Sequence, residues 1–152
     1  MLLLRAIQVE RGTQGAVLVS EIQDPRTLDV MALTKCSDSV VGNKLVSMML
    51  AQISEERDIG YVIEDLFSAE GCEMHCKDIR AFAAPNESLS FWDLVSRCQQ
   101  RNMTLMGWIR KDGNPDAAAW TAEINPADKK TKHMWNGAAA PLGDLLIVIS
   151  LD

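Results

Sequence analysis

The sequence predicts a mixed α/β protein. Its first part alternates strand and helix, as the closing elements of a doubly wound sheet do. Its middle part holds two segments with helical periodicity, and its last part consists mainly of short strands around one helix. These observations divide the 152-residue chain into residues 1–42, 43–71 and 72–152. We expect the end of an α/β lobe, a central helix-turn-helix and a small β-rich α+β lobe.

The first part contains a helix and then a strand–helix–strand unit. Residues 2–9 carry apolar side chains at helical spacing, and residues 16–19 form the continuous apolar run that is typical of parallel strands. Pro25 favours a helix over 26–33, because proline fits the first helical position, and residues 39–41 form the next strand. No G-x-G-x-x-G motif is present. We therefore predict the terminal part of a Rossmann-like lobe that binds no dinucleotide by itself.

Two helices joined by an acidic turn form the middle part. In both, apolar residues recur at i, i+3, i+4 and i+7. We expect Asn43 to cap the first helix, Asp58 to cap the second and Gly71 to end the second. The first helix is apolar over most of its girth, which predicts that a second lobe or a second subunit covers it. The residues expected at this interface are Leu45, Met48, Met49 and Ile53.

The last part has strand patterns on both sides of one helix. Ser90 and Asp93 match the S-x-x-D capping signature and predict the start of that helix. A basic loop is expected over residues 129–133. The predicted strands cover residues 72–82, 103–109, 119–124 and 145–149.

Charge and composition argue against several classes of function. Fifteen basic and 21 acidic residues give a net charge of −6, which argues against nucleic acid as the main partner. The longest apolar run, residues 145–149, is far shorter than the roughly 18–20 residues that span a bilayer. With two histidines and no G-x-S-x-G motif, the chain gives no reason to expect an enzyme.

Two clusters of metal-binding residue types each have two interpretations. Cys72, His75 and Cys76 could bind zinc, but no second Cys/His pair lies nearby, and buried small apolar side chains are the simpler interpretation. Glu55, Glu56 and Asp58 in the acidic turn could bind Ca²⁺ if a further carboxylate reached them. The alternative is a solvated turn whose charges favour the start of the second helix.

Several motifs resemble, in sequence and in order, the plant CASTOR and POLLUX ion channels. The two most specific are Asn-Lys-Leu-Val-Ser-Met at 43–48 and Glu-Asp-Leu-Phe-Ser-Ala-Glu-Gly at 64–71. Residues 19–27 and 122–129 add further matches, so that the resemblance covers nearly the whole chain. The segment that it resembles is the C-terminal end of these channels, in the second RCK (regulator of K⁺ conductance) domain.

The resemblance implies an RCK-like fold with a crossover helix pair and a homo-oligomeric gating ring assembled through those helices. The partner implied is a membrane pore domain encoded upstream of Met1, in the nuclear or plastid envelope. The ligand implied is Ca²⁺, bound by Glu55, Glu56 and Asp58, with Glu87 in the loop expected to supply another carboxylate. The alternative is a stand-alone RCK-type subunit that docks on a separate membrane channel or transporter.

Overall fold

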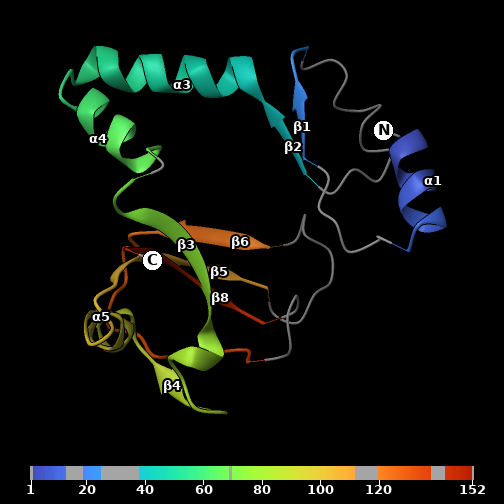
Figure 1. Cartoon of the computed structure of the whole chain (residues 1–152). Coiled ribbons are helices and arrows are strands. Elements are labelled where there is room, and N and C mark those ends of the chain that lie inside the picture. The colour runs from blue at the N-terminus through green and yellow to red at the C-terminus, as the bar shows by residue number, and fades with distance from the viewer. Residues whose placement is uncertain are drawn as a thin grey trace. The chain divides into compact units, whose positions relative to one another are not determined.

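The mixed α/β fold is confirmed by a computed structural model, which describes residues 2–12, 19–24, 38–68, 70–111, 120–137 and 143–151 (Figure 1). The chain separates into two compact units, Met1–Gly60 and Tyr61–Asp152. The boundary falls inside helix α4 (Ile59–Leu66), so the three-part division expected from the sequence stays a prediction.

The first unit contains helix α1 (Leu2–Glu10), strands β1 (Val19–Ile22) and β2 (Asp38–Val41), and helix α3 (Gly42–Glu55). β1 and β2 pair in parallel over their full lengths. Parallel neighbours require a crossover connection, which agrees with the predicted strand–helix–strand unit. The helix predicted over 26–33 and most of the strand predicted over 16–19 lie outside the described residues.

The predicted ends of the two central helices differ from the observed ones. β2 continues directly into α3, so the N-cap residue is Val41, which makes no side-chain capping bond. The prediction for Asn43 is wrong, because its Nδ2 donates to Gln23 O at 3.1 Å instead. Asp58 precedes α4 but its side chain bonds to no described residue. Gly71 adopts φ 108° well beyond the end of α4, so it does not end the helix.

The second unit is built on an antiparallel sheet of four strands in the order β3-β8-β5-β6. The strands are β3 (Glu73–Asp78), β5 (Thr104–Arg110), β6 (Thr121–Ile124) and β8 (Leu145–Ser150). Gly107 is required where β5 meets β6, since a Cβ there would lie 2.0 Å from Glu123 O. The predicted strands over 103–109 and 145–149 are confirmed, whereas the first one ends at Asp78 and passes into the short helix η2 (Ile79–Ala81).

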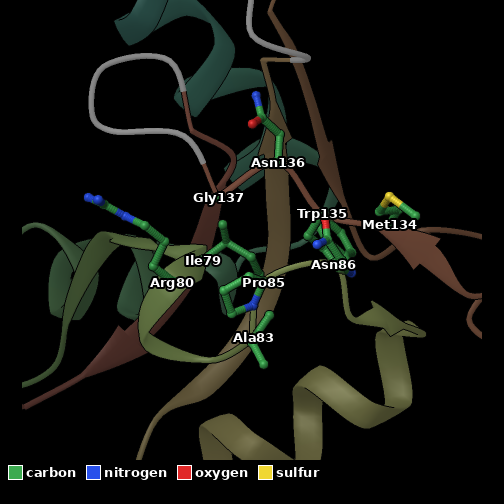
Figure 2. Close-up of a pocket in the computed structure, with 10 residues that line it drawn as sticks. Ile79, Arg80, Ala83, Pro85, Asn86, Met134, Trp135, Asn136 and Gly137 are labelled. Carbon is green, nitrogen blue, oxygen red and sulfur yellow. The ribbon is translucent and has the colours of Figure 1, made fainter.

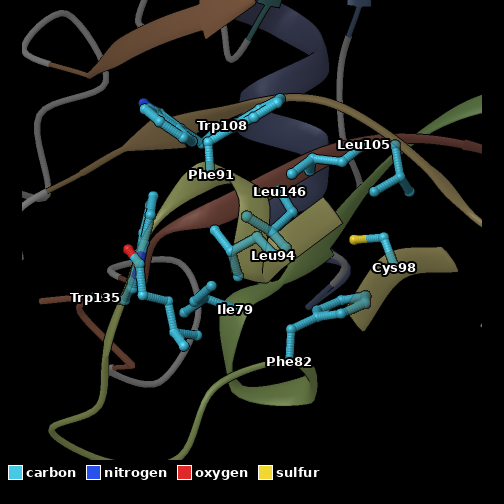
Figure 3. Close-up of a cluster of buried hydrophobic side chains, with 11 residues drawn as sticks. Ile79, Phe82, Phe91, Leu94, Cys98, Leu105, Trp108, Trp135 and Leu146 are labelled. Carbon is cyan, nitrogen blue, oxygen red and sulfur yellow. The ribbon is translucent and has the colours of Figure 1, made fainter. Parts of the chain in front are cut away.

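Helix α5 (Phe91–Gln99) begins with the predicted capping box: Ser90 Oγ accepts from Asp93 N, and the Asp93 carboxylate accepts from Ser90 N. A second, two-stranded ladder joins β4 (Ser88–Leu89) to β7 (His133–Met134). The sequence did not predict this ladder, which begins at the end of the expected basic loop. The core between α5 and the sheet is shown in Figure 3. It consists of Ile79, Phe82, Leu89, Phe91, Leu94, Cys98, Leu105, Trp108, Trp135, Leu146 and Val148.

A fully buried carboxylate, Asp144, joins three segments of this unit. Its Oδ1 accepts from Lys111 N and its Oδ2 from Asn136 N, both at 2.9 Å, and Arg110 Nε lies 3.5 Å away. Its backbone carbonyl accepts from Ile79 N at 3.1 Å. Buried charges are stabilised only when they are paired and hydrogen-bonded, as Asp144 is. Asp144 therefore fixes the backbone at Ile79 and Asn136.

Candidate functional site

Helix α3 presents apolar side chains to its surroundings in the first unit. None of its 14 residues is buried. Of the predicted interface residues, Leu45 and Met48 are 41% and 58% exposed, and Met49 and Ile53 are half-buried. Val46 and Leu50 on the same helix are also exposed. Contiguous exposed apolar groups of this kind mark interaction surfaces.

The acidic turn after α3 is fixed by its backbone. Glu56 N donates to Gln52 O at 3.0 Å, Ile59 N to Glu56 O at 3.2 Å, and Gly60 N to Arg57 O at 3.2 Å. The side chains of Glu55, Glu56, Arg57 and Asp58 are all exposed, and none bonds to a described residue. The carboxylates are thus not neutralised by Arg57, which leaves their oxygen atoms open to solvent.

Glu87, the fourth predicted metal ligand, has a structural partner. Its carboxylate accepts from Arg97 Nη2 at 2.5 Å and Nη1 at 2.8 Å, and from Ala84 N at 2.9 Å. Arg97 also donates to Phe82 O. The Arg97 hydrogen bonds, followed by the bond from Ala84 N, lower the pKa of Glu87 to about 2. The ionised carboxylate therefore ties α5 to the loop before β4, and Glu87 does not fit the role of a free metal ligand.

Within the described residues, no three His, Cys, Asp or Glu side chains come together in a group that could hold a metal ion. Glu55, Glu56 and Asp58 share one turn of the first unit, while Glu87 belongs to the second unit. The Ca²⁺ site therefore stays a prediction that rests on the turn. Cys72 is half-buried and Cys76 is exposed, so the expected burial of Cys76 is wrong, because it points away from the core on edge strand β3.

No family model matches the chain. Over 143 residues, or 94% of the chain, the sequence is 36% identical to the ion channel CASTOR of Lotus japonicus. Over the same length it is 34% identical to the probable ion channel POLLUX of Oryza sativa subsp. japonica and 31% identical to the ion channel DMI1 of Medicago truncatula. The chain is a homologue of the CASTOR and POLLUX ion channels. The predicted resemblance is confirmed.

The homology covers only part of each CASTOR or POLLUX protein. The chain spans 16% of the length of the CASTOR protein and 14% and 15% of the lengths of the other two relatives. All three relatives carry the names of ion channels and none carries the name of an enzyme. Among the described helices, none combines the length and the apolar character needed to span a membrane.

A cavity of this CASTOR/POLLUX homologue was not predicted from its sequence. It lies in the second unit between residues 79–86 and 134–137 (Figure 2). The lining residues come from two distant segments, and no spacing within either segment connects them. A local signal is Asn86, because asparagine adopts positive φ more readily than most residues, and Asn86 has φ 64°.

Proposed function

We propose that this chain is a regulatory part of an ion channel of the CASTOR and POLLUX type and forms part of its gating ring. The observation that carries this proposal is the similarity to ion channels over 94% of the chain. The parallel pair β1-β2 followed by α3 supports an RCK-like arrangement, in which a Rossmann-like lobe continues into a crossover helix. In this proposal the chain occupies the C-terminal end of the channel, outside the membrane.

The gating ring assembles through α3 of neighbouring copies. The support for this step is the exposure of the helix, because an apolar surface in water gains about 25 cal/mol for each Å² that a second copy removes from solvent. Leu45, Met48, Met49 and Ile53 are the residues that we place in this contact, and the first two are exposed. A self-complementary contact of this kind pairs two copies, as a two-fold interface between identical subunits does, so the ring also needs a second interface.

Ca²⁺ is the regulatory ligand in this proposal, and it binds the turn of Glu55, Glu56 and Asp58. The exposed, unpaired carboxylates favour a divalent cation, because hard oxygen ligands suit Ca²⁺ and the ion relieves their mutual repulsion. Three carboxylates do not complete a shell of 6–8 oxygen atoms. The remaining ligands come from water or from a neighbouring copy, since Glu87 is held by Arg97.

Oligomerisation is tested by light scattering on the native chain and on Met48→Glu. A charge placed in an apolar contact is costly, whereas the exposed Met48 tolerates it in a single copy. We expect an oligomer for the native chain, and a monomer with unchanged circular dichroism for the variant. Ser47→Glu, on the polar side of the same helix, is the matched control and should keep the oligomer. A monomeric native chain, or equal masses for Met48→Glu and native, would contradict the α3 contact.

The channel role is tested with a chimera in which this chain replaces the homologous segment of the Lotus japonicus CASTOR protein. We expect the chimera to carry ion current in planar bilayers and to respond to Ca²⁺. A triple variant with Glu55→Gln, Glu56→Gln and Asp58→Asn should conduct but lose the response. An assembled chimera without current would overturn the regulatory-part proposal. Current without any Ca²⁺ response would overturn the assignment of Ca²⁺ as the regulatory ligand. Function restored only when the chain is added as a separate protein would favour the stand-alone subunit.

A further inference from the structure

The cavity of the second unit has a volume of about 820 Å³ and lies between residues 79–86 and 134–137 (Figure 2). We propose that it binds a small organic anion with a flat apolar body, an aromatic carboxylate or phosphate. The volume is in the range of roughly 300–1,000 Å³ that is usual for small-molecule sites. This proposal concerns the isolated chain and does not depend on the channel role.

Core residues form the apolar walls of the cavity, so that the walls exist before any ligand arrives. Ile79 is 1% exposed and Trp135 is 6% exposed. The Trp135 indole Nε1 donates to Leu89 O at 3.1 Å, and its ring packs edge-on against Trp108 with centroids 5.1 Å apart. A flat wall held in this way favours a flat ligand, because little side-chain entropy is lost on binding. Met134, 62% exposed, adds an adaptable thioether at the opening.

The two lining residues that follow Trp135 are also fixed by buried groups. Asn136 N donates to Asp144 Oδ2 at 2.9 Å, and Asp144 N donates to Asn136 O at 2.8 Å. Gly137 follows, and a Cβ at that position would lie 3.3 Å from Arg80 Cγ. The backbone of 136–137 therefore comes close to the Arg80 side chain without closing the cavity.

Two polar side chains of the lining keep hydrogen-bonding capacity for a ligand. Arg80 donates through Nε and Nη2 to the Asp78 carboxylate, at 2.7–3.1 Å, and its Nη1 bonds to no described residue. The side-chain amide of Asn86 likewise bonds to none of the described residues. Asp78 holds the guanidinium in place, and the Arg80 hydrogen bonds lower the pKa of Asp78, so the pair stays ionised at neutral pH.

The arrangement of these groups decides the ligand class. Figure 2 shows Arg80 at one end of the lining, Met134 and Trp135 at the other, and Ile79 and Pro85 between them. An anionic group at Arg80 would accept from Nη1, because a guanidinium presents donors that match carboxylate and phosphate oxygens. The ring of the same molecule would extend over Ile79 and Pro85 toward Trp135. Asp78 compensates the charge of Arg80, so the preference for an anion over a cation rests on the N–H donors of Nη1, which bond to no described residue.

The test is an NMR titration of the native chain with 2-naphthoate, 2-naphthyl phosphate and the uncharged 2-naphthamide. We expect both anions to shift the Trp135 indole N–H signal and the Gly137 amide. Arg80→Gln should weaken the anions at least about tenfold, or 1.4 kcal/mol, and leave 2-naphthamide unchanged. The matched control is Lys130→Gln, another exposed cation of the same unit that does not line the cavity, and it should bind like the native chain.

A second variant tests the cavity itself. Ala84→Phe adds a large side chain at an exposed lining position, so it should abolish binding and leave the melting temperature unchanged. Signals that move only on α3, equal affinities for Arg80→Gln and native, or no shift with either anion at millimolar concentration would each overturn the proposal. A difference between the carboxylate and the phosphate identifies the anionic group. None of these outcomes changes the result of the channel chimera.

Discussion

Helices α3 and α5 differ in a way that composition does not predict. α3 is 14 residues long and rich in Leu, Val and Met, but it has no buried residue. α5 has nine residues, four of them polar or charged outside its apolar stripe, and it buries Phe91, Leu94 and Cys98. The difference lies in what each helix packs against. α5 covers a sheet within its own unit, whereas α3 lacks such a cover among the described residues of the first unit.

The apolar residues of a helix can be arranged in two ways, with different consequences for packing. In α5 the apolar residues lie on one stripe, and the stripe packs into a core of its own chain. In α3 they surround most of the helix, which is the pattern of an element that contacts another lobe or another copy. An apolar helix surface thus contributes to the stability of the unit in α5, and we propose that in α3 it contributes to association.

The largest expected effect comes from truncating one leucine in each helix. Leu94 is 0% exposed, so Leu94→Ala should lower the free energy of unfolding by about 2–5 kcal/mol through lost burial and a cavity. Leu50 is 63% exposed, and Leu50→Ala should change the free energy of unfolding by less than about 0.5 kcal/mol. Urea denaturation in the Met48→Glu background, which is expected to be monomeric, measures both changes. Similar losses in the two variants would show that α3 is packed as tightly as α5.

The helix starts give the next contrast. α5 has a capping box, and Ser90→Ala removes the acceptor for Asp93 N, which should cost about 0.5–2 kcal/mol. α3 has no side-chain cap, and Ser47 in its interior bonds only to Asn43 O one turn earlier. Ser47→Ala should therefore be neutral or slightly stabilising, because alanine is the better helix former. Thermal melts followed by circular dichroism test both variants. A loss of stability for Ser47→Ala equal to that for Ser90→Ala would contradict the conclusion that only α5 has a side-chain cap.

Local signals in the sequence predicted the elements that depend on neighbouring residues. The capping box needs only Ser90 and Asp93, and strand β8 needs only its apolar run, so both were predicted correctly. The β4-β7 ladder was missed because two residues per strand are too few for any periodicity. Asn43 was mistaken for a cap because β2 continues into α3 without a loop.

The candidate sites depend on contacts between distant residues, which no spacing shows. Glu87 pairs with Arg97 across ten positions, and nothing in the spacing of the two residues distinguishes this pair from the metal ligand that we expected at Glu87. The cavity joins Arg80 to Trp135 only after the sheet and the η2 turn have formed. The position of the acidic turn, in contrast, follows directly from where two helical patterns meet.

The smallest expected effect concerns two glutamates beside these helices, and it depends on pH. The pKa of Glu87 in the folded chain is about 2, below its ordinary value of 4.5, chiefly because of the Arg97 hydrogen bonds. A depressed folded-state pKa stabilises the fold at pH above the unfolded value, and this stabilisation is lost as the pH falls through the folded value. Glu87→Gln should therefore lower the melting temperature at pH 7, and the difference from the native chain should shrink between about pH 4.5 and pH 2.

Glu56→Gln is the matched control, because Glu56 follows α3, is exposed and has no bonded partner among the described residues. It should leave the melting temperature close to that of the native chain throughout the same pH series. Arg97→Lys adds a second check, since lysine keeps the charge but cannot form the two parallel bonds to one carboxylate. Its melting temperature should lie between those of the native chain and Glu87→Gln at pH 7. A pH-independent difference for Glu87→Gln would mean that packing of the side chain, and not the ion pair with Arg97, stabilises the loop before β4.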